Sequence, residues 1–312
     1  MPSRMHAAHC LERMENMKTL LHTVSYAGVW PGQVTLPLKT VVEKAAALGY
    51  DGLMLMAKRP HASVLDMDTE ARARLRDLVA AKGIVVGCVA GYTDFCGGAE
   101  RPDIPFREMQ IQHVTELARL ARDLGGNLVR IFTGFQHEGF SYDHQWGWCV
   151  QAIKECARRA ADMGVVIGVQ NHHDIAVHHD SLLDFLAEVD EPNCKAMFDA
   201  WSPALQGVDM VDAARKMAPV MAQTTVADYV RRPRFAYNPS LVNYDRETDA
   251  VRAVPMGEGF IDYRAFFAAL REAGFDGPVA YEMCAPLKGG GGEANLDRCA
   301  KLFLDWMQAN VV

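Results

Sequence analysis

The residues best suited to chemistry gather in one short stretch, Gln170–His179, which holds four of the eleven histidines. Single carboxylates stand further along the chain, at Asp199 and Glu282. Carboxylate, imidazole and amide oxygen are ligands of Mn²⁺, Mg²⁺, Co²⁺ and Zn²⁺. A neutral imidazole with a pKa of about 6.5 suits proton transfer at pH 7, which makes His172 a candidate. These residue types therefore predict a divalent metal site with a proton-transfer group beside it.

Each of these residues also has a purely structural interpretation. An aspartate at the end of a strand often caps the next helix, and a single histidine often only binds a carbonyl group. The functional interpretation gains weight if Asp199, Glu282 and the cluster Gln170–Asp174 line one rim of the fold. The elements that position these residues therefore decide between the two interpretations.

The chain alternates between short apolar runs and segments of helical periodicity, which is typical of strand–helix units. Eight units follow one another from Met17, at about 37 residues per unit. The predicted strands are 20–26, 52–56, 84–91, 128–133, 165–170, 195–199, 220–229 and 278–283. The predicted helices are 36–48, 69–82, 105–124, 144–163, 181–189, 209–217, 263–273 and 293–308.

This alternation predicts the α/β class and a single (β/α)8 TIM barrel over residues 17–312. Five of the predicted helices are followed by glycine, which adopts without penalty the left-handed conformation common at helix C-termini. Strands that are apolar on both faces fit a parallel sheet covered by helices. A doubly wound sheet would need a glycine-rich phosphate loop after an early strand, and neither GxGxxG nor GxxxxGK[ST] occurs.

The C-terminal ends of the strands supply further candidates, because chemistry gathers there in TIM barrels. Strand seven carries Gln223 and Thr225. Trp30 and Phe135 are aromatic residues suited to stacking on the apolar face of a ring-shaped substrate. The residues expected to contact the substrate are His22, Tyr92, Arg130, His137, His173, Trp201 and Asp228.

The polar stretch from Asp228 to Gly259 is too long for an ordinary connection. It includes a local basic patch at Arg231, Arg232 and Arg234. We expect a long loop after strand seven that acts as a lid or a binding loop, since such loops usually have these roles. A disordered insertion or an oligomer contact is the alternative.

Composition narrows the class of protein. With 39 acidic and 32 basic residues the net charge is −7, which argues against a general nucleic-acid or anionic-membrane binder. No apolar run reaches the roughly 18 residues of a membrane span. The eight cysteines lack CxxC spacing and are typical of reduced thiols, so a cytoplasmic location is expected.

The N-terminus, residues 1–16, is mixed and charged and does not have the apolar core of a signal peptide. Met17 stands directly before the first predicted strand. We therefore expect residues 1–16 to be a disordered or helical extension, or the result of a start assigned at Met1 instead of Met17.

Two segments resemble the sugar phosphate isomerase/epimerase superfamily, the xylose isomerase-like TIM barrels. The sequence MGEGFIDY at 256–263 is similar to the GxGxIDF segment of that family, and GPVAYE at 277–282 follows at the usual distance. Phe198 and Asp199 at the end of strand six are also similar. The resemblance covers roughly Lys18 to the C-terminus and is specific for the superfamily rather than for one substrate.

The resemblance implies one divalent metal, Mn²⁺ first, with Mg²⁺, Co²⁺ or Zn²⁺ as alternatives. The family holds it through Glu, Asp, His and Glu on strands five to eight, and Asp199 and Glu282 match two of these positions. Gln170 stands where strand five usually has Glu. The strand-seven position falls near Thr225, with Gln223 on the same face, so Gln223 is the expected ligand there.

The resemblance also implies a metal-dependent isomerase or epimerase that acts on a sugar, cyclitol or keto-sugar derivative. Because a glutamine amide cannot be a general base, a symmetric pair of carboxylate bases is lost at Gln170. Glu282 is then the expected base, with His172 as the second catalytic group. The alternative is a one-base lyase or dehydratase that eliminates from a keto-sugar or glycoside.

Two further classes of function compete with these. An endonuclease-IV-like phosphodiesterase shares the barrel and implies a trinuclear zinc site, but the acidic charge argues against a DNA substrate. A non-catalytic barrel subunit is the other, motivated by the two replaced ligands. The expected partners are a small carbohydrate substrate and further copies of the chain, without nucleic acid or membrane.

Overall fold

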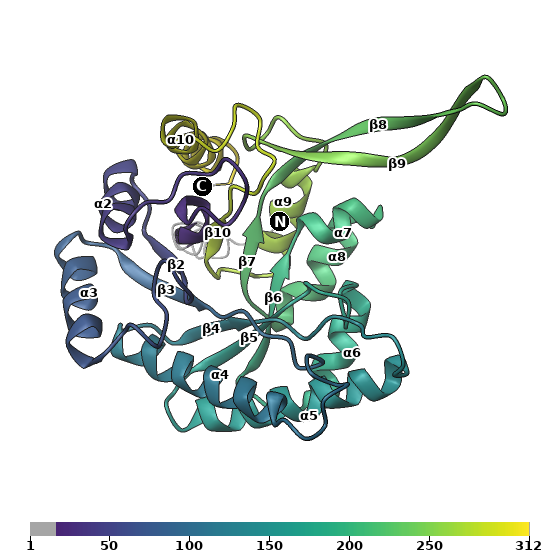
Figure 1. The fold of residues 1–312 in the computed structure, drawn as a ribbon. Coiled ribbons are helices and arrows are strands. Elements are labelled where there is room, and N and C mark those ends of the chain that lie inside the picture. The colour runs from purple at the N-terminus through teal and green to yellow at the C-terminus, as the bar shows by residue number, and fades with distance from the viewer. Residues whose placement is uncertain (1–16, 312) are drawn as a thin grey trace, which may run out of the picture.

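The apolar strands predicted from the sequence close into a barrel of parallel strands surrounded by helices (Figure 1). The computed structural model describes residues 17–311, so the predicted extension at 1–16 lies outside the described residues. The strand order around the barrel is β1-β10-β7-β6-β5-β4-β3-β2, which confirms the predicted (β/α)8 TIM barrel. The barrel strands are β1 (Thr19–His22), β2 (Gly52–Met56), β3 (Val85–Ala90), β4 (Leu128–Ile131), β5 (Val166–Gln170), β6 (Cys194–Asp199), β7 (Met221–Val226) and β10 (Val279–Tyr281).

The helices follow the strands in the predicted order. They are α2 (Leu38–Leu48), α3 (Thr69–Ala81), α4 (Phe106–Asp123), α5 (Tyr142–Ala161), α6 (His179–Val189), α7 (Trp201–Gln206), α8 (Met210–Met217), α9 (Tyr263–Glu272) and α10 (Glu293–Asn310), with two 3-10 turns at Thr23–Tyr26 and Ala218–Val220. The short helix α7 was not predicted. The glycines expected to end helices have positive φ, for example 99° at Gly49 and 81° at Gly274.

Alternation along the strands divides the apolar side chains between two layers. Leu20, Met54 and Met197 belong to a small cluster that fills the barrel interior. Residues of opposite parity, such as Leu21 and Leu53, join the larger cluster between the strands and the helices. Both faces of the sheet are therefore buried, which explains why the strands are continuously apolar in the sequence.

Two absences follow from the described residues. Among the helices of residues 17–311, none carries an apolar stretch long enough to cross a bilayer. The seven cysteines in this part of the chain are all free thiols, which agrees with the expectation of reduced cysteines.

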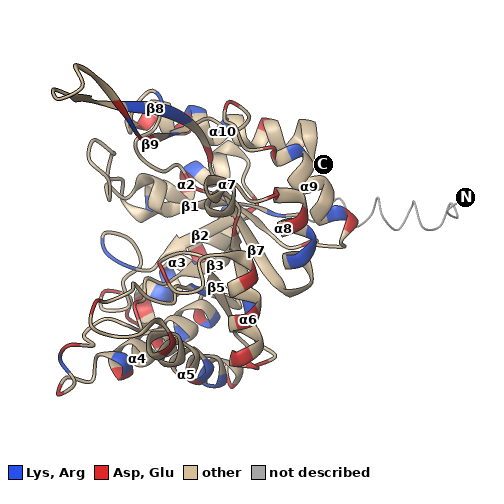
Figure 2. Ribbon diagram, turned by 90° about the vertical axis from the view of Figure 1, so that its right-hand side faces the viewer, with Lys and Arg blue, Asp and Glu red and all other residues tan. Residues whose placement is uncertain are grey.

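The segment after β7 differs from the expected long loop. It is an antiparallel hairpin of β8 (Asp228–Asn238) and β9 (Asn243–Val254), which projects from the barrel (Figure 1). Figure 2 shows the arginines of β8 near the base of the hairpin. Both faces of the hairpin are largely exposed, so no alternation of apolar and polar residues marks its strands in the sequence.

The tight barrel interior generates a stability prediction at Gly168 of β5. A methyl group there would lie 2.2 Å from Cγ of Met197, so Gly168→Ala is expected to destabilise the fold by about 1–3 kcal/mol. Gly147→Ala in α5 is the matched control, because nothing lies within 4 Å of the added methyl. This control is expected to stabilise by roughly 0.5–1 kcal/mol. Urea denaturation measures both, and equal effects of the two substitutions would contradict the packing of the interior.

Candidate active site

A cavity of about 300 Å³ opens at the C-terminal ends of the barrel strands. This is the end of the barrel at which chemistry was expected. Many of the candidate residues predicted from the sequence line it, together with aromatic and aliphatic side chains. The lining residues are Val24, Val29, Trp30, Lys58, Tyr92, Arg130, Phe132, Gln170, His172, His173 and Glu282.

Glu282 follows β10 directly and faces the buried histidine His22. Its Oε2 atom lies 3.8 Å from Nε2 of His22, and its Oε1 atom accepts a hydrogen bond from the thiol of Cys284 at 3.5 Å. Burial raises the pKa of Glu282 above its ordinary value, and the charge of Arg130 opposes this shift. A carboxylate in this setting holds a proton more readily than an exposed one and is suited to general base catalysis.

His22 is neutral in this environment. Burial, and then the charge of Arg130, lower its pKa well below the ordinary value. Its Nδ1 atom lies 3.1 Å from the carbonyl oxygen of Met54, to which it donates. Nε2 is therefore the acceptor, and it receives a hydrogen bond from Nη2 of Arg130 at 3.4 Å. The interaction of His22 with Glu282 is thus not an ion pair.

Arg130, from β4, places a positive charge in the wall of the cavity. Its side chain is buried, and its guanidinium carbon lies 4.7 Å from the ring centre of Tyr92 and 4.0 Å from that of Phe132. Nη1 donates to the carbonyl oxygen of Gly91 at 3.0 Å, whereas Nε has no hydrogen-bond partner. No carboxylate of residues 17–311 lies within 4.0 Å of this guanidinium.

The residues expected to bind a metal come from four neighbouring strands, since β5, β6, β7 and β10 are adjacent in the barrel. Asp199 is fully buried, and its Oδ2 accepts from Nε2 of Gln170 at 3.2 Å. Burial, followed by the charge of Glu282, raises the pKa of Asp199 well above the ordinary value. Its Oδ1 accepts from the backbone of Trp201 at the start of α7, so the capping interpretation also holds in part.

Three buried oxygen atoms near this rim have no hydrogen-bond partner among the described residues: Oε1 of Gln170, Oε1 of Gln223 and Oγ1 of Thr225. Leaving such atoms unsatisfied is costly. With Asp199 and Glu282 they form a set of oxygen donors, which is the chemistry that Mg²⁺ and Mn²⁺ prefer. The residues therefore fit a hard divalent cation.

The strand register refines the expectation for strand seven. Thr225 pairs with Asp199, whereas Gln223 pairs with Met197 one layer deeper in the barrel. Nε2 of Gln223 lies 3.4 Å from the sulfur of Met54, which belongs to the interior cluster. Thr225 is thus in the same layer of the barrel as Asp199, whereas Gln223 lies one layer deeper in the barrel interior.

His172 and His173 face the cavity as neutral imidazoles. Burial and the charge of Arg130 lower the pKa of His172 to about 4. Burial, followed by His172 and Arg130, lowers the pKa of His173 to about 3. The backbone N–H of His173 donates to Nδ1 of His172 at 2.8 Å, so the proton of His172 is on Nε2. His173 has a φ of 68°, a conformation that non-glycine residues adopt mainly where function demands it.

Trp201 lies near the cavity without being among its lining residues. Its ring centre is 6.0 Å from that of His172 and 5.2 Å from that of Tyr229 at the base of the hairpin. The aromatic contacts place Trp201 behind His172, where it supports the wall of the cavity.

Four expected substrate-binding residues are not among the lining residues: His22 and Trp201, described above, and Asp228 and His137. The carboxylate of Asp228 accepts hydrogen bonds from the backbone of Tyr229, Gly257 and Gly259, each at 2.9 Å, and so fixes the base of the hairpin. His137 lies 3.8 Å from carboxylate oxygens of both Asp94 and Glu100. Lys58 and Phe132 line the cavity but were not among the expected site residues, although Lys58 is a polar residue two positions after the end of β2.

One other group of ligands was found in residues 17–311. His178, His179 and Asp180 at the start of α6 offer ligand atoms within 4.8 Å of one another. They do not line the cavity, and Asp180 already binds Nζ of Lys216 at 3.1 Å. In residues 17–311, no second group of three His, Cys, Asp or Glu residues brings its ligand atoms this close together.

The comparison with known families agrees with the barrel and its rim. Residues 42–303 match the family described as xylose isomerase-like TIM barrel. The chain belongs to this family. The resemblance noted in the sequence is therefore confirmed.

Curated relatives and solved structures of this family carry out more than one reaction. The chain is 23% identical over 263 residues to the 3-dehydroshikimate dehydratase of Bacillus anthracis, covering 82% of this chain and 88% of the relative. It is 20% identical over 205 residues to the fructoselysine 3-epimerase of Escherichia coli O157:H7, covering 63% and 74%. The D-psicose 3-epimerase structure from Clostridium cellulolyticum H10 superposes with a TM-score of 0.72 at 18% identity, covering 95% and 99%. Epimerases and a dehydratase are thus both among its relatives.

The buried carboxylates generate a stability prediction. The pKa of Asp199 is higher in the folded state than in the unfolded state. The free energy of unfolding therefore falls as the pH rises from the ordinary carboxyl pKa to the raised pKa, because ionised Asp199 is less stable in the folded protein. In the presence of a chelator, Asp199→Asn is expected to stabilise the protein by about 1–2 kcal/mol at pH 8 and by less at pH 5. Asp184→Asn, at an exposed position of α6, is the control. It is expected to leave the stability of the protein nearly unchanged at both pH values.

Calorimetric melting with added MnCl₂ completes this test. Wild type and Asp184→Asn are expected to rise in Tm with Mn²⁺, because an ion bound only by the native state stabilises it. Asp199→Asn is expected to lose this rise. An equal rise in Tm in all three proteins would show that Mn²⁺ binds away from Asp199.

Proposed function

We propose that the chain is an enzyme that abstracts a proton next to the carbonyl group of a sugar-derived keto compound, with Glu282 as its one carboxylate base. The observation that carries the proposal is the asymmetry of the cavity. Glu282 is a mostly buried carboxylate with a raised pKa, whereas the position expected to hold a second carboxylate is Gln170. A glutamine amide cannot accept the proton that a two-base epimerisation requires.

The state of His172 supports the same assignment. Its Nδ1 is occupied by the backbone N–H of His173, and its pKa is lowered to about 4, so Nε2–H is a donor at neutral pH. A neutral imidazole of this kind donates a hydrogen bond to a substrate oxygen rather than taking a proton from carbon. The role expected for His172 therefore becomes that of a donor to the carbonyl oxygen of the substrate.

The reaction then needs one base. The carboxylate of Glu282 takes the proton from the carbon next to the carbonyl, and the electron pair of that bond forms the double bond of an enolate. Nε2–H of His172 and the guanidinium of Arg130 stabilise the negative charge on the enolate oxygen. A hydroxyl proton then passes between the two enediol oxygens. Glu282 returns its proton to the carbon of the former carbonyl group, which gives the isomer.

The residues proposed to hold a divalent ion, with Mn²⁺ preferred, are Asp199, Glu282, Gln170 and either Gln223 or Thr225. When bound, such an ion would polarise the carbonyl or hydroxyl oxygen of the substrate. The protein's own contribution is to orient the sugar, to exclude water with Trp30 and Phe132, and to hold the proton on Glu282.

β-Elimination is the second candidate function. The same carboxyl group of Glu282, once protonated, can give its proton to a leaving hydroxyl while the enolate electrons expel it as water. The similarity to a 3-dehydroshikimate dehydratase over 82% of this chain supports this alternative. The relatives named as 3-epimerases support the substrate class, a keto-sugar derivative, more than the two-base reaction.

The remaining expectations on partners and location stay predictions. These are a small carbohydrate substrate, self-association, no binding of nucleic acid or membrane, and a cytoplasmic location. Exposed apolar side chains on the hairpin, including Phe235, Leu241 and Val242, are the surface where self-association is expected. Sedimentation equilibrium measures the mass of the assembly.

The catalytic assignment predicts the effect of Glu282→Gln. Turnover of a responsive keto-sugar, followed by NMR, is expected to fall by about 10²–10⁴-fold with the fold intact. In the wild type, kcat/KM is expected to fall as the pH drops, because Glu282 must be ionised both to act as the base and to hold the divalent ion. Glu272→Gln, on the surface of α9, is the control and is expected to leave turnover unchanged. Full activity of Glu282→Gln would remove Glu282 from the mechanism.

A further inference from the structure

Lys58 lies two residues after β2 and lines the cavity with an exposed side chain. It brings to the cavity a positive charge that has no ion-pair partner among the described residues. Its Nζ atom lies 3.8 Å from the ring centre of Tyr92, the same ring that Arg130 contacts at 4.7 Å. Among residues 17–311 no carboxylate lies within 4.0 Å of either cation, whereas the neighbouring Arg59 is paired with Asp66 at 2.6 Å. Two cations therefore share one corner of the cavity, and no carboxylate of the described residues forms a direct ion pair with either of them.

The polar atoms of this corner are hydrogen-bond donors that lack acceptors. The hydroxyl group of Tyr92 and Nε of Arg130 are buried without a hydrogen-bond partner in the described residues. Burial raises the pKa of the Tyr92 hydroxyl, so it keeps its proton. Unsatisfied donors beside two positive charges indicate a missing acceptor that carries negative charge.

Other polar groups of the cavity have the reverse character. Glu282, directly after β10, and Oε1 of Gln170, at the end of β5, supply acceptor atoms, and Gln170 donates to the buried carboxylate of Asp199. The cavity is therefore polarised, with a cationic corner formed by Lys58, Tyr92 and Arg130 and an anionic wall formed by the carboxylates. A ligand that is neutral throughout would leave the cationic corner uncompensated.

We propose that the substrate of this site carries an anionic group, a carboxylate or a phosphate, that binds at the cationic corner formed by Lys58, Tyr92 and Arg130. The inference rests on the proposed function, because it places the reacting carbon at Glu282 and the charged end of the same molecule at Lys58. The side chain of Lys58 is at the mouth of the cavity, where a charged group keeps part of its hydration.

The test measures binding to three ligands with one carbon skeleton. These are D-glucitol, which is neutral, D-gluconate, which has a carboxylate, and D-glucitol 6-phosphate. Calorimetric titration at low salt is expected to show that one of the two anions binds about tenfold more tightly than D-glucitol, with the preference falling as salt is added. Which anion is preferred identifies the charged group.

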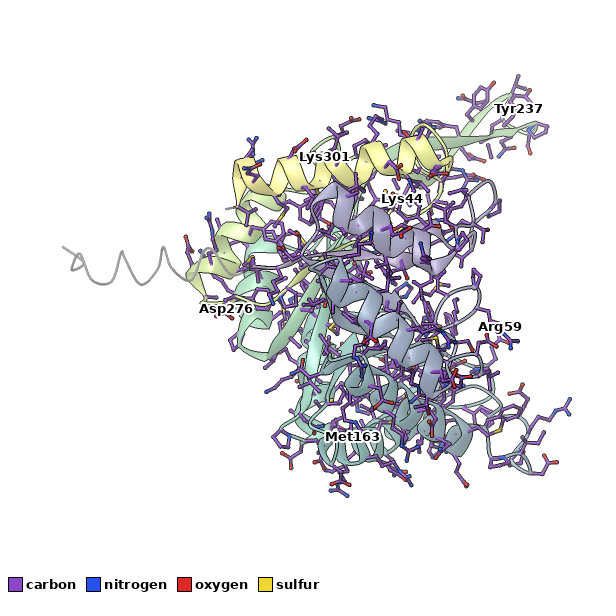
Figure 3. All side chains as sticks on the ribbon, turned by 90° about the vertical axis from the view of Figure 1, so that its left-hand side faces the viewer. Lys44, Arg59, Met163, Tyr237, Asp276 and Lys301 are labelled. Atoms are coloured by element: carbon purple, nitrogen blue, oxygen red, sulfur yellow. The ribbon has the colours of Figure 1, made fainter. Side chains whose placement is uncertain are left out.

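Variants assign the preference to the corner. Lys58→Gln is expected to remove most of the preference for the anion while leaving the affinity for D-glucitol unchanged. Arg59→Gln removes a charge from the adjacent residue, which Figure 3 labels and whose side chain pairs with Asp66, and it is expected to keep the preference. A preference that survives Lys58→Gln, or that Arg59→Gln abolishes equally, would overturn the assignment.

Failure of this inference is separable from failure of the proposed function. Equal affinity for all three ligands, or no binding of either anion at millimolar concentration, would overturn the anionic substrate. Binding requires no turnover, so a preference for the anion without any reaction at Glu282 would overturn only the proposed function. Efficient turnover of neutral keto-sugars without a preference for anions would overturn only the inference.

Discussion

The site depends on one electrostatic constraint, the placement of Asp199 and Glu282 close together and away from water. Asp199 is buried and Glu282 is mostly buried, and burial followed by the charge of Glu282 raises the pKa of Asp199. Like charges in such a setting are tolerated only when a cation compensates them or when one carboxylate is protonated. Arg130 supplies part of this compensation at a distance. The unsatisfied oxygens of Gln170, Gln223 and Thr225 mark the place where a metal ion would supply the rest.

This constraint sets the state of the surrounding groups. Burial, followed by the charge of Arg130, lowers the pKa of His22 and His172, so the imidazoles of the cavity stay neutral and cannot offset the carboxylates. The proton on Nε2 of His172 makes that residue a donor, and Gln170 brings an amide where the resemblance implied a carboxylate. The cavity therefore has one base, donors on the opposite side, and a cationic corner at its mouth. For a barrel whose relatives include epimerases, we therefore propose proton transfer by a single carboxylate at this rim.

The barrel and the position of the rim were predictable from the sequence, because both depend on local patterns. Continuous apolar strands, glycines such as Gly49 and Gly274 after helices, and regular spacing define the strand–helix units. Gln170, His172 and Glu282 were found since each follows or ends a strand. The hairpin of β8 and β9 was not predicted, because neither of its faces is buried and no periodicity results. Asp228 holds backbone N–H groups of a segment about thirty residues away, which spacing does not reveal. The tautomer of His172 depends on the local backbone conformation at His173, which residue types alone do not fix.

The central claim is that one carboxylate moves the proton, and the configuration at the exchanging carbon tests it most directly. A responsive keto-sugar is incubated with the enzyme in D₂O, and both recovered substrate and product are examined by NMR and mass spectrometry. The account predicts that deuterium enters the carbon next to the carbonyl in recovered substrate with its configuration retained, because Glu282 returns the proton to the face from which it took it. Deuterium that appears mainly in the inverted epimer, with a second acid on the opposite face, would contradict it.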